Sequence, residues 1–312
     1  MRPRVLAVTG ATTSGKTDLS LELAHQLGAE IVSMDSRQVY RGMDIGTDKI
    51  GRSERRGVPH FGLDLVDPDE RFSAGRFARA ARGWIEEIES RGHIPLFVGG
   101  TGFFLRALLE PIFREPEMDP EALKQLREVL GDFPLEWLTR AVRRLDPVRA
   151  PVAIPGGRQR MTRTVEVPLL TGRPLSWWHE HAPQDGPAVP ALVVWVELDR
   201  DELDRRIDAR VARMVEAGLL DEVQGLLDAG YGPDAPGMTG TGYREMVAVL
   251  QGRMKLADGL ERMRLQTRQY ARRQITWFRH QLPDDVLRVD GSLPLDSKVE
   301  QVMAAWTERR SE

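Results

Sequence analysis

The sequence predicts an α/β fold: a parallel sheet core with helices on both faces, and an all-helical domain inserted into it. Two observations lead to this prediction. Short apolar runs of strand length recur along the chain, and segments with helical spacing lie between them. Between residues 111 and 190 the strand pattern stops, and amphipathic pieces take its place. We therefore assign residues 1–110 and 191–312 to the two parts of the core, and residues 111–190 to the insert.

The first strand leads into a segment with the form of a phosphate-binding loop. The apolar run 5–8 meets a glycine-rich stretch, and leucines at 19, 23 and 27 then recur with helical spacing. Glycines let backbone N–H groups turn toward one point, and a helix N-terminus adds partial positive charge there. Lys16 supplies a full charge, and the Thr17 hydroxyl can hold Mg²⁺. The segment predicts a P-loop NTPase-like core, with an ordinary glycine turn as the alternative. The loop residues are Gly10, Ala11, Thr12, Thr13, Ser14, Gly15, Lys16 and Thr17.

Composition excludes several classes of protein. Hydrophobic residues make up 41% of the 312 residues, enough for a large core, and the formal net charge is −3. The absence of cysteine excludes disulfides, thiolate zinc sites and a cysteine nucleophile. No apolar run approaches the roughly 20 residues that span a membrane. We expect a soluble cytoplasmic protein without a membrane partner, and the spacing of its six histidines does not indicate a metal site.

The second strand, residues 29–34, ends at Asp35. In open parallel sheets, ligands lie beyond the carboxyl ends of the strands, so we expect Asp35 to face the same crevice as the phosphate loop. A carboxylate there serves as a general base, a metal ligand or a helix cap, and all three interpretations stay open. Residues 42–59 are polar and glycine-rich, which is typical of a surface lid or substrate loop.

The third strand also ends in a glycine turn. Ser73 is expected to cap a helix that runs to about Glu89, and residues 94–98 follow as a strand with a proline at its start. The turn 99–102 then opens a short helix, 103–109. This turn serves either tight packing or a ligand, which the Thr101 hydroxyl would contact.

The insert and the rest of the core are predicted from the same patterns. In the insert, four amphipathic pieces predict helices at 120–130, 135–145, 159–170 and 175–181. After it come a strand at 191–198, a helix beginning near Asp199, a basic helix at 261–280, a strand at 285–289 and a closing helix at 294–309.

Positive charge is concentrated in two stretches despite the negative total. Residues 140–173 hold eight arginines against two acids, and residues 262–279 hold six arginines and no acid. Local basic stripes are typical of polyanion binding, whereas a solvated helix face is the alternative.

The placement of carboxylates favours group transfer over mechanical hydrolysis of a nucleotide. Asp199 is the only strand-end acid that resembles a motor's Mg²⁺ ligand, and it falls at an expected helix cap. Asp35 is instead suited to deprotonating a substrate that attacks whatever the phosphate loop holds. A small-molecule kinase also meets this description.

Taken in order, the motifs resemble those of the tRNA dimethylallyltransferase, or tRNA isopentenyl transferase, family over nearly the whole chain. The stretch from Asp35 to Thr47 is the most specific. The other motifs that carry the resemblance are residues 10–17, 99–102, 160–163 before 165–167, 242–244 and 272–277.

The resemblance implies a substrate for the phosphate loop. The loop and Arg210 would hold the diphosphate of dimethylallyl diphosphate, with Mg²⁺ on Thr17. Asp35 and Thr101 would be catalytic, close to the exocyclic amine of the adenosine that follows the anticodon on its 3′ side. Adenine's amine is a weak nucleophile, which is why a base is needed. A target base must also leave its stack, which costs a few kcal/mol that tRNA contacts must offset.

By the same resemblance, the partner is the anticodon stem-loop of tRNA, and we expect a monomer. The residues expected to contact tRNA are Asp35, Ser36, Arg37, Gln38, Gln159, Arg160, Met161, Thr162, Arg163, Gly242, Tyr243, Arg244, Arg272, Arg273 and Gln274.

The chain departs from the family pattern at three places. Ala11 stands where the family usually has proline, and residues 154–158 replace the usual approach to Arg160. Leu123 lies where relatives often carry an arginine, with Lys124 beside it. Three alternative functions remain: an adenine-nucleotide isopentenyltransferase, a P-loop small-molecule kinase, and a non-catalytic RNA-binding protein.

Overall fold

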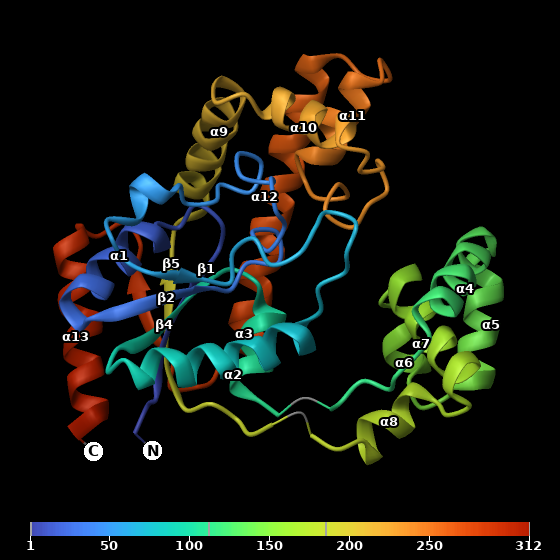
Figure 1. Ribbon diagram of the computed structural model, residues 1–312, viewed down its shortest axis with the longest axis horizontal. Helices are drawn as coiled ribbons and strands as arrows, with labels where there is room; N and C mark the ends of the chain where they lie inside the picture. Colours follow the sequence, from blue (N-terminus) through green and yellow to red (C-terminus); the bar gives the residue numbers. More distant parts are fainter. Residues whose placement is uncertain (1, 112, 185, 312) are drawn as a thin grey trace. The chain divides into compact units, whose positions relative to one another are not determined.

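The chain divides into two compact units, which we describe separately (Figure 1). The computed structural model describes residues 2–111, 113–184 and 186–311. The sheet unit comprises the chain up to Glu110 and from Ala188 onward, and the helical unit comprises Pro111–Pro187. The sheet unit resumes at 188, before the expected residue 191, because Val189 N already donates to Leu108 O at 3.2 Å.

Six parallel strands form the sheet, in the order β3-β2-β4-β1-β5-β6. β1 lies between β4 and β5 and is buried along its whole length, as its continuous apolar run predicts. Since all strands are parallel, their carboxyl ends meet at one edge. The strands are β1 (Val5–Gly10), β2 (Ala29–Ser33), β3 (His60–Phe61), β4 (Ile94–Gly99), β5 (Ala191–Glu197) and β6 (Leu287–Asp290).

Helices cover both faces of the sheet, which confirms the predicted fold class. Leu6 and Val8 of β1 pack with α1 and α13, whereas Val5 and Ala7 point to the other face and its helices. In Figure 1, α1 and α13 lie together on one side of the strands. The helices of this unit are α1 (Lys16–Leu27), α2 (Ala74–Ser90), α3 (Gly102–Leu109), α9 (Arg200–Glu216), α10 (Leu219–Asp228), α11 (Tyr243–Leu250), α12 (Leu256–Gln281) and α13 (Leu295–Ser311), with a 3₁₀ turn at Arg52–Arg55.

Several elements differ from the sequence-based prediction. α12 begins at Leu256, five residues before the predicted start, and α10 and β3 were not predicted at all. The early start follows from packing, since a Cβ on Gly259 would lie 2.8 Å from Val249 Cγ2 and only glycine lets α12 approach α11 so closely. Ser73 and Asp199 do cap helices, through bonds from Arg76 N at 3.2 Å and Asp201 N at 2.8 Å.

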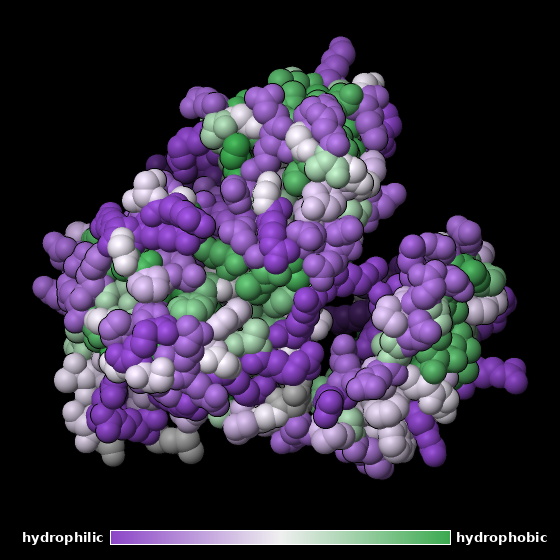
Figure 2. All heavy atoms as spheres, viewed as in Figure 1, coloured by the Kyte–Doolittle hydropathy of each residue, from purple (hydrophilic) through white to green (hydrophobic). Residues whose placement is uncertain are grey.

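Helices alone make up the secondary structure of the helical unit's described residues, apart from an isolated bridge between Phe113 and Gln184. Leu130, Leu138 and Val165 are among the side chains that form its core. Figure 2 shows hydrophobic side chains on the surface over α4 and α5. The helices are α4 (Pro120–Asp132), α5 (Leu135–Leu145), α6 (Ala150–Ala153), α7 (Arg158–Thr171) and α8 (Leu175–His181). Among the described residues of both units, no helix has the length and apolar character to cross a membrane.

Candidate active site

The phosphate loop joins the end of β1 to the start of α1. Gly15 precedes the helix with φ +89°, a left-handed conformation that glycine adopts without strain. Thr13 is also left-handed, at φ 62°, and its buried hydroxyl has no hydrogen-bond partner among the described residues. Lys16 Nζ donates to Ala11 O at 2.6 Å and lies 3.4 Å from Ser14 Oγ. The lysine thus closes the loop over the helix N-terminus, where an anion is favoured.

Burial strongly affects the charge of Lys16. Removal from water lowers the pKa of its amine to about 8; the positive charge of Arg210 contributes to this shift, while Asp35 and Asp48 oppose it. A phosphate in the loop would stabilise the protonated amine. The loop is therefore suited to bind a multiply charged anion.

Arg210 reaches the phosphate loop from α9, as expected. Its Nη1 donates to the Thr12 hydroxyl, and its Nε lies 3.4 Å from Asp48 Oδ2. Its side chain is mostly buried, with 15% exposed. Because the guanidinium is held beside the loop, it adds a second fixed positive charge where a diphosphate would lie.

Gln274 has a different place from the one predicted. Its Nε2 donates to Gly100 O at 2.7 Å, and its Oε1 accepts from Thr12 N at 2.9 Å. The residue is buried, with 7% exposed. The amide therefore uses its donor and its acceptor to join the two glycine loops. A tRNA contact from Gln274, as expected from the resemblance, would have to break one of these bonds.

The ends of β2 and β4 bring Asp35 and Thr101 to one place. Asp35 Oδ1 accepts from Arg37 N at 2.8 Å within a turn, and no helix follows, so the helix-cap interpretation of Asp35 is wrong. Thr101 Oγ1 accepts from Ser36 N at 3.0 Å. Both residues therefore lie at the carboxyl edge of the sheet, Thr101 after the strand that pairs with β1 and Asp35 after the next strand along.

Tyr270, a residue that the sequence analysis did not select, joins this group. Its side chain hydrogen-bonds Thr101, and burial together with the charge of Asp35 raises the pKa of its phenol to about 12. Tyr270 lies one helical turn before Gln274 on α12, so the two share a face. That spacing, together with the expected role of Gln274, is a signal that could have identified it.

The glycines of the turn 99–102 serve tight packing. A Cβ on Gly99 would collide with Met34 O, and one on Gly100 with Gln274 Nε2. The Thr101 hydroxyl already bonds Ser36 and Tyr270. The packing interpretation of the turn therefore holds for its glycines, and a ligand contact from Thr101 stays a prediction.

Arg37 and Gln38 also bond within the protein. Arg37 Nη1 donates to Pro236 O at 3.0 Å. Gln38 accepts from Ser33 Oγ at 2.9 Å and donates to Asp48 O at 3.2 Å. These bonds orient the segment that follows Asp35, and a tRNA contact from either side chain must compete with them.

The segment 42–49 is an anchored loop rather than a loose surface lid. The Glu222 carboxylate of α10 accepts from the consecutive backbone N–H groups of Asp44, Ile45 and Gly46 at 2.8, 2.6 and 3.1 Å. It also accepts from the Tyr243 hydroxyl at 2.6 Å. The sequence held no signal for this carboxylate, because its backbone partners in the loop lie more than 170 residues away.

A buried lysine fixes the same segment from its other end. The Lys49 side chain is only 3% exposed, and its Nζ lies 2.6 Å from both Asp44 Oδ1 and Asp64 Oδ1. It also donates to Tyr40 O at 2.7 Å. With two carboxylates and a carbonyl around it, the ammonium is fully partnered, so it anchors the loop.

The expected contacts at 242–244 separate into two kinds. Tyr243 is buried with 1% exposed, and its hydroxyl bonds Glu222, so its side chain is not on the surface where a tRNA contact was expected. Gly242 is left-handed at φ +95°, and its N–H donates to the buried Glu245 carboxylate. Arg244 is exposed on the surface, 3.1 Å from Glu245.

In the helical unit, residues 159–163 lie in the first turns of α7. Gln159 and Arg160 are exposed, and Thr162 is half-buried. Met161 is 3% exposed within the helical core, so its side chain is not on the surface where a tRNA contact was expected. Helical periodicity explains the difference, since one residue in each turn must face the core.

Arg163 belongs to an ion-pair network. Its Nη1 lies 3.0 Å from Glu166 Oε1 and its Nη2 lies 3.0 Å from Glu115. Glu166 is 1% exposed and also accepts from Arg127 at 2.7 Å twice. Although burial opposes it, these two guanidiniums hold the pKa of the Glu166 carboxyl below its usual value. Arg163 therefore has a structural role in addition to its predicted one.

On α12, Arg272 and Arg273 are both exposed but differ in their partners. Arg272 Nη2 lies 3.5 Å from Asp204 of α9. The Arg273 guanidinium lies over the Tyr270 ring, 6.0 Å from its centroid. Arg273 is thus the better placed of the two for a ligand beside Tyr270.

Thr17 fits a Mg²⁺ that is held mainly by a ligand's phosphates. It is exposed in the first turn of α1, and its hydroxyl bonds none of the described residues. No group of three or more histidine and acidic side chains within the described ranges is arranged to hold a metal. Mg²⁺ commonly takes only one or two protein ligands beside phosphates and water, which agrees with this arrangement.

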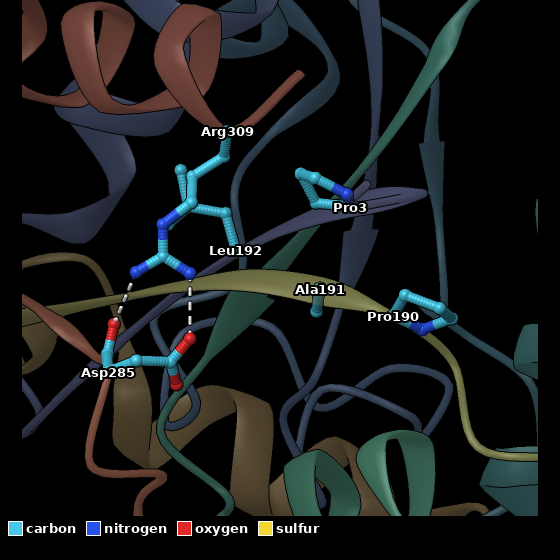
Figure 3. A pocket seen from close by; sticks show the side chains of 6 residues that line it. All are labelled: Pro3, Pro190, Ala191, Leu192, Asp285 and Arg309. Carbon is cyan, nitrogen blue, oxygen red and sulfur yellow. Dashed lines mark hydrogen bonds and ion pairs between the residues drawn. The ribbon is translucent and has the colours of Figure 1, made fainter. Parts of the chain in front are cut away.

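A cavity of about 230 Å³ lies away from these residues, at the opposite end of β5 (Figure 3). Pro3, Pro190 and Leu192 line it together with an Arg309–Asp285 ion pair at 2.7 Å. Because it opens at the amino ends of the strands, we do not connect it with the phosphate loop.

Comparison with known proteins identifies the family. A family model described as IPP transferase matches residues 38–281, and one described as isopentenyl transferase matches residues 3–61. The chain is 42% identical to a tRNA dimethylallyltransferase of Geobacter metallireducens, over 98% of both chains. It is 45% identical to one of Thermomicrobium roseum, over 89% of this chain and 84% of that one. The chain belongs to the tRNA dimethylallyltransferase family.

Solved structures of this family share the fold. A tRNA isopentenylpyrophosphate transferase of Staphylococcus epidermidis matches with a TM-score of 0.71 and 32% identity, over 99% of this chain and 100% of that one. A eukaryotic dimethylallyltransferase acting on tRNA matches with a TM-score of 0.80 and 28% identity, over 98% of this chain and 79% of that one. The resemblance inferred from the motifs is confirmed.

Two departures from the tRNA dimethylallyltransferase pattern have local explanations. Ala11 is buried in a small cluster with Ile207 of α9, where its methyl group fills the space. Arg158 donates to carbonyls at the end of α4, including Phe133 O at 2.9 Å. Cations are favoured beside the carbonyls at a helix C-terminus, so the altered 154–158 loop closes α4.

Proposed function

We propose that this protein transfers a dimethylallyl group from dimethylallyl diphosphate to the exocyclic amine of the adenosine on the 3′ side of the tRNA anticodon. One observation carries the proposal: a phosphate loop with two fixed cations lies at the same sheet edge as Asp35 and Thr101. The diphosphate leaves as an anion, which the cations of the phosphate loop would stabilise. The acceptor amine must lose a proton, which a carboxylate at the same sheet edge would accept.

In the proposed reaction one bond forms, at the adenine amine, and one bond breaks, at the diphosphate. The adenine amine nitrogen forms a bond to the allylic carbon while the bond from that carbon to the diphosphate oxygen breaks. Asp35 accepts the amine proton, and Thr101 holds the segment after Asp35 through Ser36 N. The electron pair leaves with the diphosphate, whose charge Lys16, the loop amides and Arg210 stabilise.

Magnesium is part of the proposal at Thr17. The Thr17 hydroxyl would hold Mg²⁺, which would neutralise part of the leaving group's charge. Lys16 and Arg210 would fix the diphosphate of the donor.

We propose that the tRNA contacts come from exposed residues among those expected. Gln159 and Arg160 of the helical unit are exposed, as are Arg244 and Arg273 of the sheet unit. Arg163, Arg244 and Arg272 have ion-pair partners, which tRNA phosphates would have to displace.

A transfer assay tests the proposal. Protein, Mg²⁺ and labelled dimethylallyl diphosphate are offered bulk tRNA, AMP, or ATP with no acceptor. We expect label in tRNA alone. Label in AMP would instead indicate an adenine-nucleotide isopentenyltransferase, and ATP turnover without label transfer would indicate a kinase.

Asp35→Asn separates catalysis from binding in the same assay. We expect transfer to fall by at least about 100-fold, within the range of a lost general base, while tRNA affinity changes little. Asp132→Asn, on an exposed position at the end of α4, is the control. Normal turnover by Asp35→Asn would remove Asp35 as the base.

A further inference from the structure

The arginines of α12 fall into two groups by their partners. On the face toward α9, Arg268 Nη2 lies 2.6 Å from Asp208, and Arg272 lies 3.5 Å from Asp204. These ion pairs join the two helices. Charge on this face is therefore largely balanced inside the protein.

Nearer its start, α12 carries an arginine without an ion-pair partner among the described residues. Arg262 is exposed and forms no ion pair with any residue in the described ranges. The neighbouring acid, Glu261, lies 3.6 Å from Arg264 instead. Arg262 lines a cavity of about 360 Å³ together with Arg244 and Arg253.

One carboxylate faces this arginine cluster. Glu245 is 2% exposed, and it already accepts from Gly242 N at 2.8 Å and from Arg244 at 3.1 Å. Arg253 is held by Gln251, whose Oε1 accepts from its Nε at 2.9 Å. Three guanidiniums and one carboxylate line this cavity, so its local charge is about two positive units. A bound anion would reduce the repulsion between the guanidiniums.

We propose that Arg244, Arg253 and Arg262 form a binding site for backbone phosphates of an RNA strand. The fork of N–H donors on each guanidinium matches phosphate oxygens, and Gln266 adds an uncharged donor to the same cavity. The inference rests on the proposed function, because it names where the same tRNA continues beyond the reacting adenosine.

The position along α12 gives the distance between this cavity and Tyr270. Arg262 lies eight residues before Tyr270, which a rise of 1.5 Å per residue converts to about 12 Å. A stacked strand presents one phosphate per about 3.4 Å of axis, so this length corresponds to roughly three to four nucleotides. We assign the cavity to the strand that continues from the reacting adenosine on its 3′ side, where a separation of this length reaches the stem that adjoins the anticodon loop.

The salt dependence of tRNA binding tests the site. The dissociation constant of unmodified tRNA is measured from low to moderate salt for the wild type and for Arg253→Ala/Arg262→Ala. We expect several-fold weaker binding at low salt and a slope of log K against log salt that is shallower by about one to two, the value for one or two lost phosphate contacts.

Three controls make the result specific. Arg205→Ala removes an exposed arginine of α9 that pairs with Glu202 at 2.7 Å, and its slope should match the wild type. Arg262→Lys keeps the charge and should keep most of the slope. An anticodon stem-loop shortened to its first stem pair should bind the wild type and the double variant nearly equally.

The outcomes separate this inference from the proposed function. A double variant with the wild-type slope overturns the site while leaving prenyl transfer in place. A wild type that binds no tRNA, or transfers no label to it, overturns both. An equal loss of affinity for long and shortened stem-loops would also overturn the assignment to the stem.

Discussion

At the scale of single residues, the side-chain amide of Gln274 joins parts of the chain that are far apart in sequence. It connects Thr12 of the phosphate loop with Gly100 of the turn after β4. An amide fits this place because it offers one donor and one acceptor, each to a buried backbone group that would otherwise be unpaired.

Gln274→Ala is expected to lower the free energy of unfolding by about 1–3 kcal/mol, since two buried backbone groups lose their partner. The KM for dimethylallyl diphosphate should rise as well, because the phosphate loop is less constrained. Thermal unfolding and steady-state kinetics measure both. Gln281→Ala, exposed at the end of the same helix, is the control. A loss of tRNA affinity with unchanged stability would contradict this role.

Lys16 links donor binding to pH. Its folded pKa of about 8 lies below the ordinary value of 10.5, so between these values the unfolded chain holds the proton more tightly than the folded one. The protein without ligand should therefore become more stable as pH rises from about 8 to 10.5. Bound diphosphate favours the protonated amine, so binding must draw in a proton at high pH.

We expect the KM for dimethylallyl diphosphate to rise above about pH 8, approaching tenfold per pH unit, as the free lysine loses its proton. Steady-state kinetics from pH 7 to 10 measure this. Lys16→Arg is the matched variant, because its guanidinium stays charged throughout and its profile should lack the rise. Parallel profiles for the two proteins would contradict the assignment.

At the scale of elements, α10 and α11 position the loop that follows β2. Glu222 accepts from Asp44, Ile45 and Gly46, and this loop continues into Asp48, which contacts both Gln38 and Arg210. A hydrogen-bonded path thus runs from α10 to the phosphate loop. Burial and the Glu222 carboxylate together raise the pKa of the Tyr243 phenol, which therefore stays protonated and donates.

Glu222→Ala is expected to lower the free energy of unfolding by about 2 kcal/mol, because three backbone N–H groups and the Tyr243 hydroxyl lose their shared acceptor. Tyr243→Phe, which removes a single bond, should cost about 1 kcal/mol. Denaturant unfolding measures both. Asp221→Asn, on an exposed position of α10, should have the wild-type stability. Equal stability of Glu222→Ala and Asp221→Asn would show that the loop does not depend on this anchor.

At the scale of the whole molecule, each of the two units has its own core and its own buried ion network. Glu166 holds Arg127 of α4 and Arg163 of α7 in the helical unit. In the sheet unit, Glu30 accepts from Arg91 at 2.6 Å beside His93. Because neither network extends into the other unit, local damage to one unit should leave the other folded.

Glu166→Ala should unfold the helical unit more easily, since two guanidiniums lose their shared carboxylate. The lowered pKa of Glu166 means that its contribution is present above about pH 4.5 and is lost as pH falls through the folded pKa. Limited proteolysis with site mapping should show earlier cleavage within residues 111–187. Glu136→Ala, exposed on α5, is the control, and cleavage first in the sheet unit would contradict the prediction.

The sequence by itself determined the features that depend on neighbours along the chain. The apolar runs, the glycine loop with Lys16 and Thr17, the helical pieces of the insert and the order of motifs were all predicted correctly, because each is a local pattern. The family followed from these patterns alone.

Tertiary structure alone decided which of the expected contact residues remain available to a ligand. Met161, Tyr243 and Gln274 looked equivalent to their exposed neighbours in sequence, yet all three are buried. The partners that decide this lie in other elements: for Gln274 the bonded residue Thr12 is 262 positions away. The same long-range pairing neutralises Arg272 and leaves Arg262 open, and no local pattern contains that information.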